Sequence, residues 1–150
     1  MVVLNIFCAV SNGGQTWSSS NVQAFTLGFM DMHNVLPINA IAHGGNTFIA
    51  GASSIIARRA AASGAGNSQL GGAINAIAYG NGNFVAGAAN GVMSYSRDNG
   101  ATWTQIGSAA ANSLDRSTFA FNQAIHGIAH GSGRFIAVGA NGKMSIGVHD

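Results

Sequence analysis

The sequence contains no glutamate and very little charge of either sign. Its 150 residues include four aspartates, one lysine and five arginines, so that only 7% are charged. Amphipathic helices usually carry Glu and Lys on their exposed faces, and the 22 glycines disfavour helix interiors. With 47% hydrophobic residues the chain can still bury a core. The composition therefore predicts an all-β protein of short strands joined by tight turns.

Cysteine and clustered positive charge are also scarce. Cys8 is the only cysteine, which excludes an internal disulfide and a four-thiolate metal site. The formal charge is +2 and only Arg58 and Arg59 are adjacent cations, whereas nucleic-acid binding needs a focused basic face. The apolar run 2–10 is too short to span a membrane and lacks a positive leader. We expect no nucleic-acid partner, no membrane insertion and no signal peptide.

The chain contains three related segments, which begin at Ile38, Ile74 and Ile125. In each segment an Ile precedes a Phe by seven residues, and a Gly separates two short β-branched runs. This pattern predicts two strands joined by a tight turn. Asn-Gly pairs at 90–91 and 141–142 then predict a second hairpin turn, because Asn-Gly readily adopts positive φ. In the first segment Ser54-Ile55 stands at that place, so a different turn is expected there.

The stretch SRDNGATW follows the third strand of the middle segment. It resembles an Asp-box, the signature of the BNR repeats of sialidases and of many non-enzymatic β-propellers, with matches at Ser96, Asp98, Gly100, Thr102 and Trp103. An earlier, looser copy has Asn12, Gly14, Thr16 and Trp17, with Val10 in the place of the serine. The aspartate side chain is suited to bracing a turn by accepting backbone N–H groups, and the Trp to covering apolar surface. The resemblance implies a structural motif between the third and fourth strands of a blade, away from the central axis.

Residues 1–150 are interpreted as one repeat-built domain of about three propeller blades, with units starting near Ile38, Ile74 and Ile125. Blades contain four antiparallel strands, and rings usually contain four to eight blades. The register begins and ends within a blade, which leaves unpaired sheet edges. We expect a homo-oligomer that completes the ring, with a six-bladed dimer as the first model. A fragment of a longer propeller is the alternative, and it predicts a monomeric, poorly soluble chain.

Catalysis is not expected, although the motif is sialidase-like. Glycoside hydrolysis generally uses a carboxylate pair, whereas the chain has no glutamate and Asp98 belongs to the box. His126 and His130 are four residues apart on an expected strand, where that spacing does not converge on a metal. A metal or ligand site would need two chains to bring His43 and His130 together. Gly-rich strings lie between strands rather than opening a helix, so no dinucleotide and no other cofactor is predicted.

Two functions fit these observations. The first is a non-catalytic structural or adhesive module on an exterior surface, with a phage capsid decoration or tail-fibre protein as a natural setting. This module would bind itself and a larger virion or cell-surface protein. The second is a carbohydrate-binding lectin, in which side chains at repeated positions would bind glycans. Arg58, Arg59, Arg97 and Arg134 are candidates for acidic sugars or an acidic partner, or are simply solvated charges.

Overall fold

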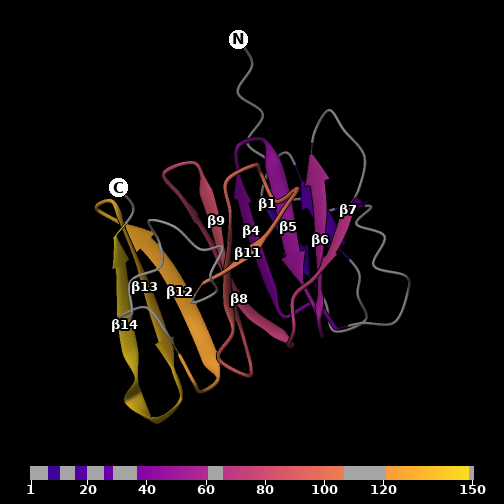
Figure 1. Cartoon of the computed structure of the whole chain (residues 1–150). Helices are drawn as coiled ribbons and strands as arrows, with labels where there is room; N and C mark the ends of the chain where they lie inside the picture. Colours follow the sequence, from indigo (N-terminus) through magenta and orange to yellow (C-terminus); the bar gives the residue numbers. More distant parts are fainter. Residues whose placement is uncertain are drawn as a thin grey trace.

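The computed structural model describes residues 7–10, 16–19, 26–28, 37–60, 66–106 and 121–148. Within these ranges the regular structure is β-strand, apart from one 3₁₀ turn, η2 (Ala140–Gly142). The strands form four antiparallel sheets (Figure 1). The prediction of an all-β protein built from small antiparallel sheets is confirmed.

Each sheet is a meander, in which strands that follow one another in sequence are also neighbours. The first sheet contains β1 (Phe7–Val10), β2 (Thr16–Ser19) and β3 (Thr26–Gly28). The second contains β4 (Ala40–Gly44), β5 (Thr47–Gly51), β6 (Ile55–Ala60) and β7 (Gly66–Gln69). The third contains β8 (Ile74–Gly80), β9 (Asn83–Ala88), β10 (Met93–Ser96) and β11 (Thr104–Gln105). The fourth contains β12 (Ile125–Gly131), β13 (Arg134–Gly139) and β14 (Met144–Val148).

The first strands of successive sheets lie next to one another. β8 lies between β4 and β12, and β1 also contacts β4. Figure 1 shows β12–β14 on one side of β8 and β9, and β4–β7 on the other. The sheets therefore fan out from a shared row of inner strands, as propeller blades do.

The turns between the first two strands of the last three sheets share one conformation. Residues 45–46, 81–82 and 132–133 all have positive φ, which is the requirement of a two-residue type I′ turn. These turns close the pairs Gly44–Thr47, Gly80–Asn83 and Gly131–Arg134. A glycine paired with Asn46, Asn81 or Ser132 thus gives three equivalent hairpin turns.

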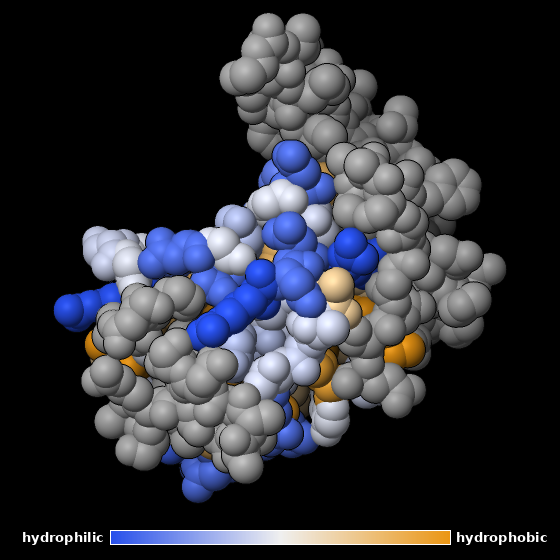
Figure 2. Space-filling model, turned by 45° about the horizontal axis from the view of Figure 1, so that its top comes forward, coloured by the Kyte–Doolittle hydropathy of each residue, from blue (hydrophilic) through white to orange (hydrophobic). Residues whose placement is uncertain are grey.

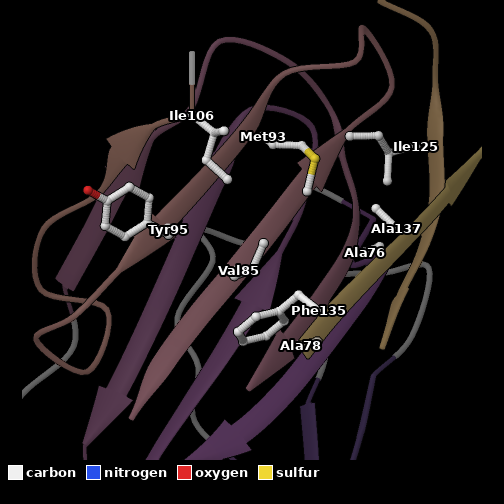
Figure 3. Close-up of a cluster of buried hydrophobic side chains, with 9 residues drawn as sticks. All are labelled: Ala76, Ala78, Val85, Met93, Tyr95, Ile106, Ile125, Phe135 and Ala137. Atoms are coloured by element: carbon white, nitrogen blue, oxygen red, sulfur yellow. The ribbon is translucent and has the colours of Figure 1, made fainter. Parts of the chain in front are cut away.

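The core lies between sheets, because each strand turns alternate side chains toward each neighbouring sheet. Between the third and fourth sheets, Val85, Met93 and Tyr95 pack against Ile125 and Phe135. Figure 3 shows these side chains in the space between the two sheets, together with Ala76, Ala78, Ile106 and Ala137. A second cluster, between the second and third sheets, includes Ile49, Ile56, Ile74, Ile77 and Phe84.

The structure differs from the sequence prediction in the number and size of the sheets. About three four-stranded blades were expected, whereas four sheets are present and two of them have three described strands. The residues before Ile38 were interpreted as the end of a blade, whereas β1, β2 and β3 form a three-stranded sheet of their own. Among the described residues of segment 55–73, β6 and β7 complete the second sheet. β6 is the third strand expected after the turn at Ser54-Ile55, whereas β7 was not predicted, because its sequence has little similarity to the other repeats.

The two Asn-Gly pairs also form different turns. Asn141 and Gly142 both have positive φ, as expected, whereas at 90–91 only Gly91 does. The Asn90 side chain instead accepts the Val92 N–H at 3.2 Å and donates to the Gly71 carbonyl oxygen at 2.8 Å. A side chain that bonds to its own turn and to a neighbouring segment favours this second conformation.

No helix among the residues that the structure describes is long and apolar enough to cross a membrane.

Candidate functional site

Residues 96–103 form the turn between β10 and β11, where the Asp-box motif was predicted. Ser96 donates its hydroxyl to Asp98 Oδ1 at 2.7 Å and accepts the Gly100 N–H at 2.8 Å. Asp98 also accepts the Thr102 N–H at 2.8 Å and the Thr102 hydroxyl. Trp103 Nε1 donates to the Gly100 carbonyl oxygen at 3.3 Å. The structure therefore brings all five residues of the fuller motif together, and both carboxylate oxygens bond within the turn.

The pKa of Asp98 lies below its ordinary value. Desolvation is the largest single influence and acts to raise the pKa. Hydrogen bonds from the Thr102 hydroxyl and N–H, from Ser96 and from Ala101 together outweigh it and lower the pKa. Asp98 is consequently an ionised acceptor at neutral pH, as the bracing of the turn requires.

The Asp-box turn also contacts the preceding sheet. Gly100 has φ +80° and lies against Ile49 so closely that a β-carbon would not fit. Arg58 Nε, on β6, donates to the Asn99 carbonyl oxygen at 3.0 Å. Trp103 packs on the cluster that the second and third sheets share. The turn thus joins two neighbouring sheets as well as two strands.

The looser copy of the motif falls partly outside the described residues. Asn12 and Gly14 lie there. Thr16 and Trp17 lie in β2, where Thr16 pairs with Val10 and Trp17 with Ala9. The corresponding Thr102 and Trp103 precede their strand instead. The Thr-Trp pair of the looser copy therefore lies within a strand, whereas that of the fuller copy lies just before one.

A row of aromatic rings lies at the end of the first strands from which the type I′ turns extend. His43, Tyr79 and His130 hold the same repeat position, and we call them the ring row. Each ring contacts the Phe opposite it on the second strand, with centroids 4.3, 4.6 and 4.7 Å apart respectively. His43 is exposed, and the other two rings are partly buried.

Glycines on the neighbouring first strands make this arrangement possible. The Tyr79 ring lies directly on Gly44, and the His130 ring lies directly on Gly80, so neither glycine has room for a β-carbon. Each ring thus bridges two sheets. His130 Nε2 is buried and, among the described residues, accepts or donates no hydrogen bond. The repeated positions of the rings and of the glycines are visible in the sequence. Each ring, however, contacts the glycine of a different repeat, which the sequence does not indicate.

The remaining polar candidates are dispersed. His126 is exposed at the opposite end of β12 from His130, at a β-bulge. Arg97 is exposed above the ring of buried Tyr95, at 5.2 Å from its centroid, and Arg134 is exposed at the start of β13. The backbone of Arg59 lies in β6. His43 and His130 are separated by Tyr79 and its strand, and the described part of the chain has no group of three His, Cys, Asp or Glu residues that could hold a metal.

Two kinds of contact between sheets, one polar and one formed by glycines, were not predicted. Asn75, at the β8 position equivalent to His126, donates Nδ2 to the Ile125 carbonyl oxygen at 3.0 Å. Gly51 and Gly87 hold equivalent positions on second strands, and each receives an isoleucine pair from the next sheet: Ile74 and Ile77, or Ile125 and Ile128. We call these positions the glycine sockets. A repeat alignment identifies the glycines, but not what they touch.

One broad face of the molecule is mainly polar. Figure 2 shows it as hydrophilic or neutral over most of the described residues, with hydrophobic residues in small, separate areas. This surface favours contacts with solvent and with polar partners.

The four sheets and their row of inner strands define a β-propeller-like fold. No family model matches the sequence, and no curated protein matches it. The structure is similar to that of YCF48 bound to a D1 peptide, with a TM-score of 0.65 and 14% identity, over 93% of this chain and 46% of that one. It is also similar to a chain of the mitotic checkpoint complex, with a TM-score of 0.68 and 12% identity, over 95% of this chain and 44% of that one. The chain thus spans less than half the length of either neighbour, and at this identity the likeness shows the fold alone.

Proposed function

We propose that the chain is a non-catalytic, protein-binding β-propeller module with an Asp-box turn of the BNR type. The observation that carries the proposal is the ring row, which places aromatic groups at one end of neighbouring first strands. Asp98, the acidic residue of the sialidase-like motif, is meanwhile fully engaged in bracing its turn. The chemistry of the motif is therefore structural, and the surface offered for binding is exposed His43 with the adjacent turns, since Tyr79 and His130 are partly buried between sheets.

A protein segment is the partner that this surface fits best. Exposed His43 provides a ring and hydrogen-bonding nitrogens, and the adjacent turns carry the exposed amides Asn46 and Asn81. Aromatic and amide groups together suit the alternating apolar and polar groups of an extended peptide. The two similar structures were determined with a bound peptide and within a protein complex, respectively.

We place this module on an exterior surface, as a structural or adhesive protein, and propose a phage virion as its setting. A capsid decoration or tail-fibre protein would use a chain of low charge that is rich in Gly, Ala, Ser and Asn. We propose that it also associates with copies of itself. Its partners are then a second copy of the chain and a larger virion or cell-surface protein. Two measurements test this setting: whether the protein is present in intact virions, and whether the purified chain binds to virions produced without its gene. A negative result in both contradicts the proposal.

Peptide binding is tested with the purified chain on an array of extended peptides, at moderate salt. We expect micromolar binding that His43→Ala weakens by about fivefold or more, because one exposed ring and its hydrogen bonds are lost. His126→Ala is the matched control, since His126 is exposed at the other end of the inner strands. Equal loss in the two variants, or no peptide binding by the native chain, contradicts the proposal.

A lectin is the second candidate, favoured by the same exposed ring and amide groups, which also suit sugar hydroxyls and apolar sugar faces. A glycan array under the same conditions separates the two functions. Binding to one class of sugar that is lost in His43→Ala, without peptide binding, supports the lectin and excludes the peptide-binding proposal.

A further inference from the structure

All four exposed large hydrophobic side chains of the described residues lie on one face of β13 and β14. Ile136, Val138, Met144 and Ile146 are 38, 44, 62 and 41% exposed, respectively. Ile136 pairs with Ile146 and Val138 with Met144 across the two strands, so the four side chains form one continuous strip. We call this strip the open face. A contiguous apolar strip of this kind, rather than scattered single residues, marks an interaction surface.

The equivalent face of the third sheet is an interface within the chain. Val85 and Met93 correspond to Ile136 and Met144 in the repeat, and Tyr95 corresponds to Ile146. All three are buried, at 0, 3 and 4% exposure, beneath the fourth sheet. The corresponding residues of the second sheet, Ile49 and Ile56, are buried in the same way beneath the third sheet. The open face therefore continues a series of two sheet-to-sheet interfaces.

The glycine of the fourth sheet that corresponds to Gly44 and Gly80 is not covered by a ring. Gly44 is covered by Tyr79 and Gly80 by His130, whereas the equivalent Gly131 has no atom within 4 Å of its β-carbon position. We call the glycine positions that a ring covers, or could cover, glycine seats. The seat of the fourth sheet, at Gly131 on β12, is uncovered and lies beside the open face. Both features of a sheet that receives a neighbour, the apolar strip and the glycine seat, occur together.

One residue distinguishes the open face from the internal interfaces. Val138 stands where Gly51 and Gly87 form the glycine sockets. Those sockets receive the isoleucine pairs of the second and third repeats, and a valine leaves no space for such a pair. The incoming sheet must therefore lack an Ile-x-x-Ile first strand of the repeat type. In this chain the sheet β1–β3 is outside the three repeats that begin with that strand.

We propose that the open face binds a second copy of this chain, whose β1–β3 sheet packs on β12–β14 and closes the arc of sheets into a ring. The inference deepens the proposed self-association by naming the surface. The second sheet already lies next to β1 in the same chain, so the sheet order of one copy continues into the next. A two-fold axis along the ring axis then forms the same contact twice.

The first test measures mass by light scattering after size-exclusion chromatography, over a range of concentrations. We expect the native chain to be a dimer at micromolar concentration. The double variant Ile136→Asp, Met144→Asp should dissociate about 100-fold more readily, because two carboxylates would be buried without partners. Val138→Gly should weaken the dimer by about tenfold through loss of apolar contact. Ser53→Asp, at an exposed turn of the second sheet, is the control and should leave the mass unchanged.

A second measurement does not depend on a folded double variant. In the native chain with methyl-labelled methionine, the Met144 signal should move with chain concentration and lose access to a soluble paramagnetic probe in the dimer. The signal of Met93, its buried repeat equivalent, should do neither. Met144→Leu assigns the signal.

The outcomes separate the inference from the proposed function. A native dimer that persists in the folded double variant, or in which Met144 stays accessible, overturns the open face as the interface while self-association stands. A native chain that is monomeric at all concentrations overturns both. The peptide and glycan arrays, repeated with the monomeric double variant, judge the ring row independently of assembly.

Discussion

The third and fourth sheets carry nearly the same pattern on β9–β10 and β13–β14, yet their environments differ. On β10, Met93 is 3% exposed, and on β14 its equivalent Met144 is 62% exposed. The difference lies in what covers each sheet, since the third sheet is covered by the fourth and the open face has no described neighbour. The comparison teaches that in a repeat-built fold the same residue is core or surface according to its sheet neighbour, and not according to its local sequence.

The largest expected difference concerns this methionine pair. Met93→Asp should destabilise the fold by about 3 kcal/mol or more, because a charge would be buried among Val85, Tyr95 and Phe135. Met144→Asp should change the free energy of unfolding of the monomer by only about 0.5 kcal/mol. Chemical denaturation at concentrations where the chain is monomeric measures both. Equal losses would show that the open face is part of the core of a single chain.

A smaller difference is expected from exchanging the socket residues. Gly87→Val places a β-carbon about 2.6 Å from Ile125 Cγ2, so overpacking should cost about 1–3 kcal/mol. The reverse change, Val138→Gly, should cost the monomer less than about 1 kcal/mol, through backbone entropy alone. Melting temperatures and denaturation midpoints of the two variants give the comparison. A neutral Gly87→Val would mean that the third and fourth sheets are not packed as closely as described.

The smallest expected effect concerns the Asp-box turn, which braces the third sheet. Because the pKa of Asp98 in the folded chain is below its ordinary value, its ionised form contributes stability that is fully present above about pH 4 and is lost as the pH falls through the lowered pKa. Asp98→Asn should cost about 1 kcal/mol at neutral pH and flatten the acid side of the stability profile. Asp115→Asn, outside the box, is the control. If the free energy of unfolding of Asp98→Asn fell at low pH as steeply as that of the native chain, the bracing role would be refuted.

Much of the local structure was predictable from short sequence signals. Gly and Asn at 45–46 and 81–82 predict hairpin turns because they adopt positive φ at little cost, and β-branched runs on both sides predict strands. The sheet β1–β3 and the strand β7 were not predicted as they occur. They lack the repeat pattern, and strands without it are specified mainly by their partners.

The candidate site divides in the same way. The hydrogen bonds of the Asp-box are local, spanning residues 96–103, so the motif itself indicates them. The contacts of Tyr79 with Gly44 and of His130 with Gly80 join residues of different repeats. No spacing within one repeat indicates such a contact, because it depends on how two sheets pack.

By itself, the sequence determined the strand-and-turn repeat and the bracing of the Asp-box turn, because both follow from φ preferences and from hydrogen bonds between residues a few positions apart. The tertiary structure alone decided which glycines became seats and sockets, which methionine became core, and where an apolar strip stayed uncovered. Burial is a property of neighbouring sheets, and contacts between residues of different sheets, such as Gly51 with Ile74 and Gly80 with His130, are set only when the sheets pack together.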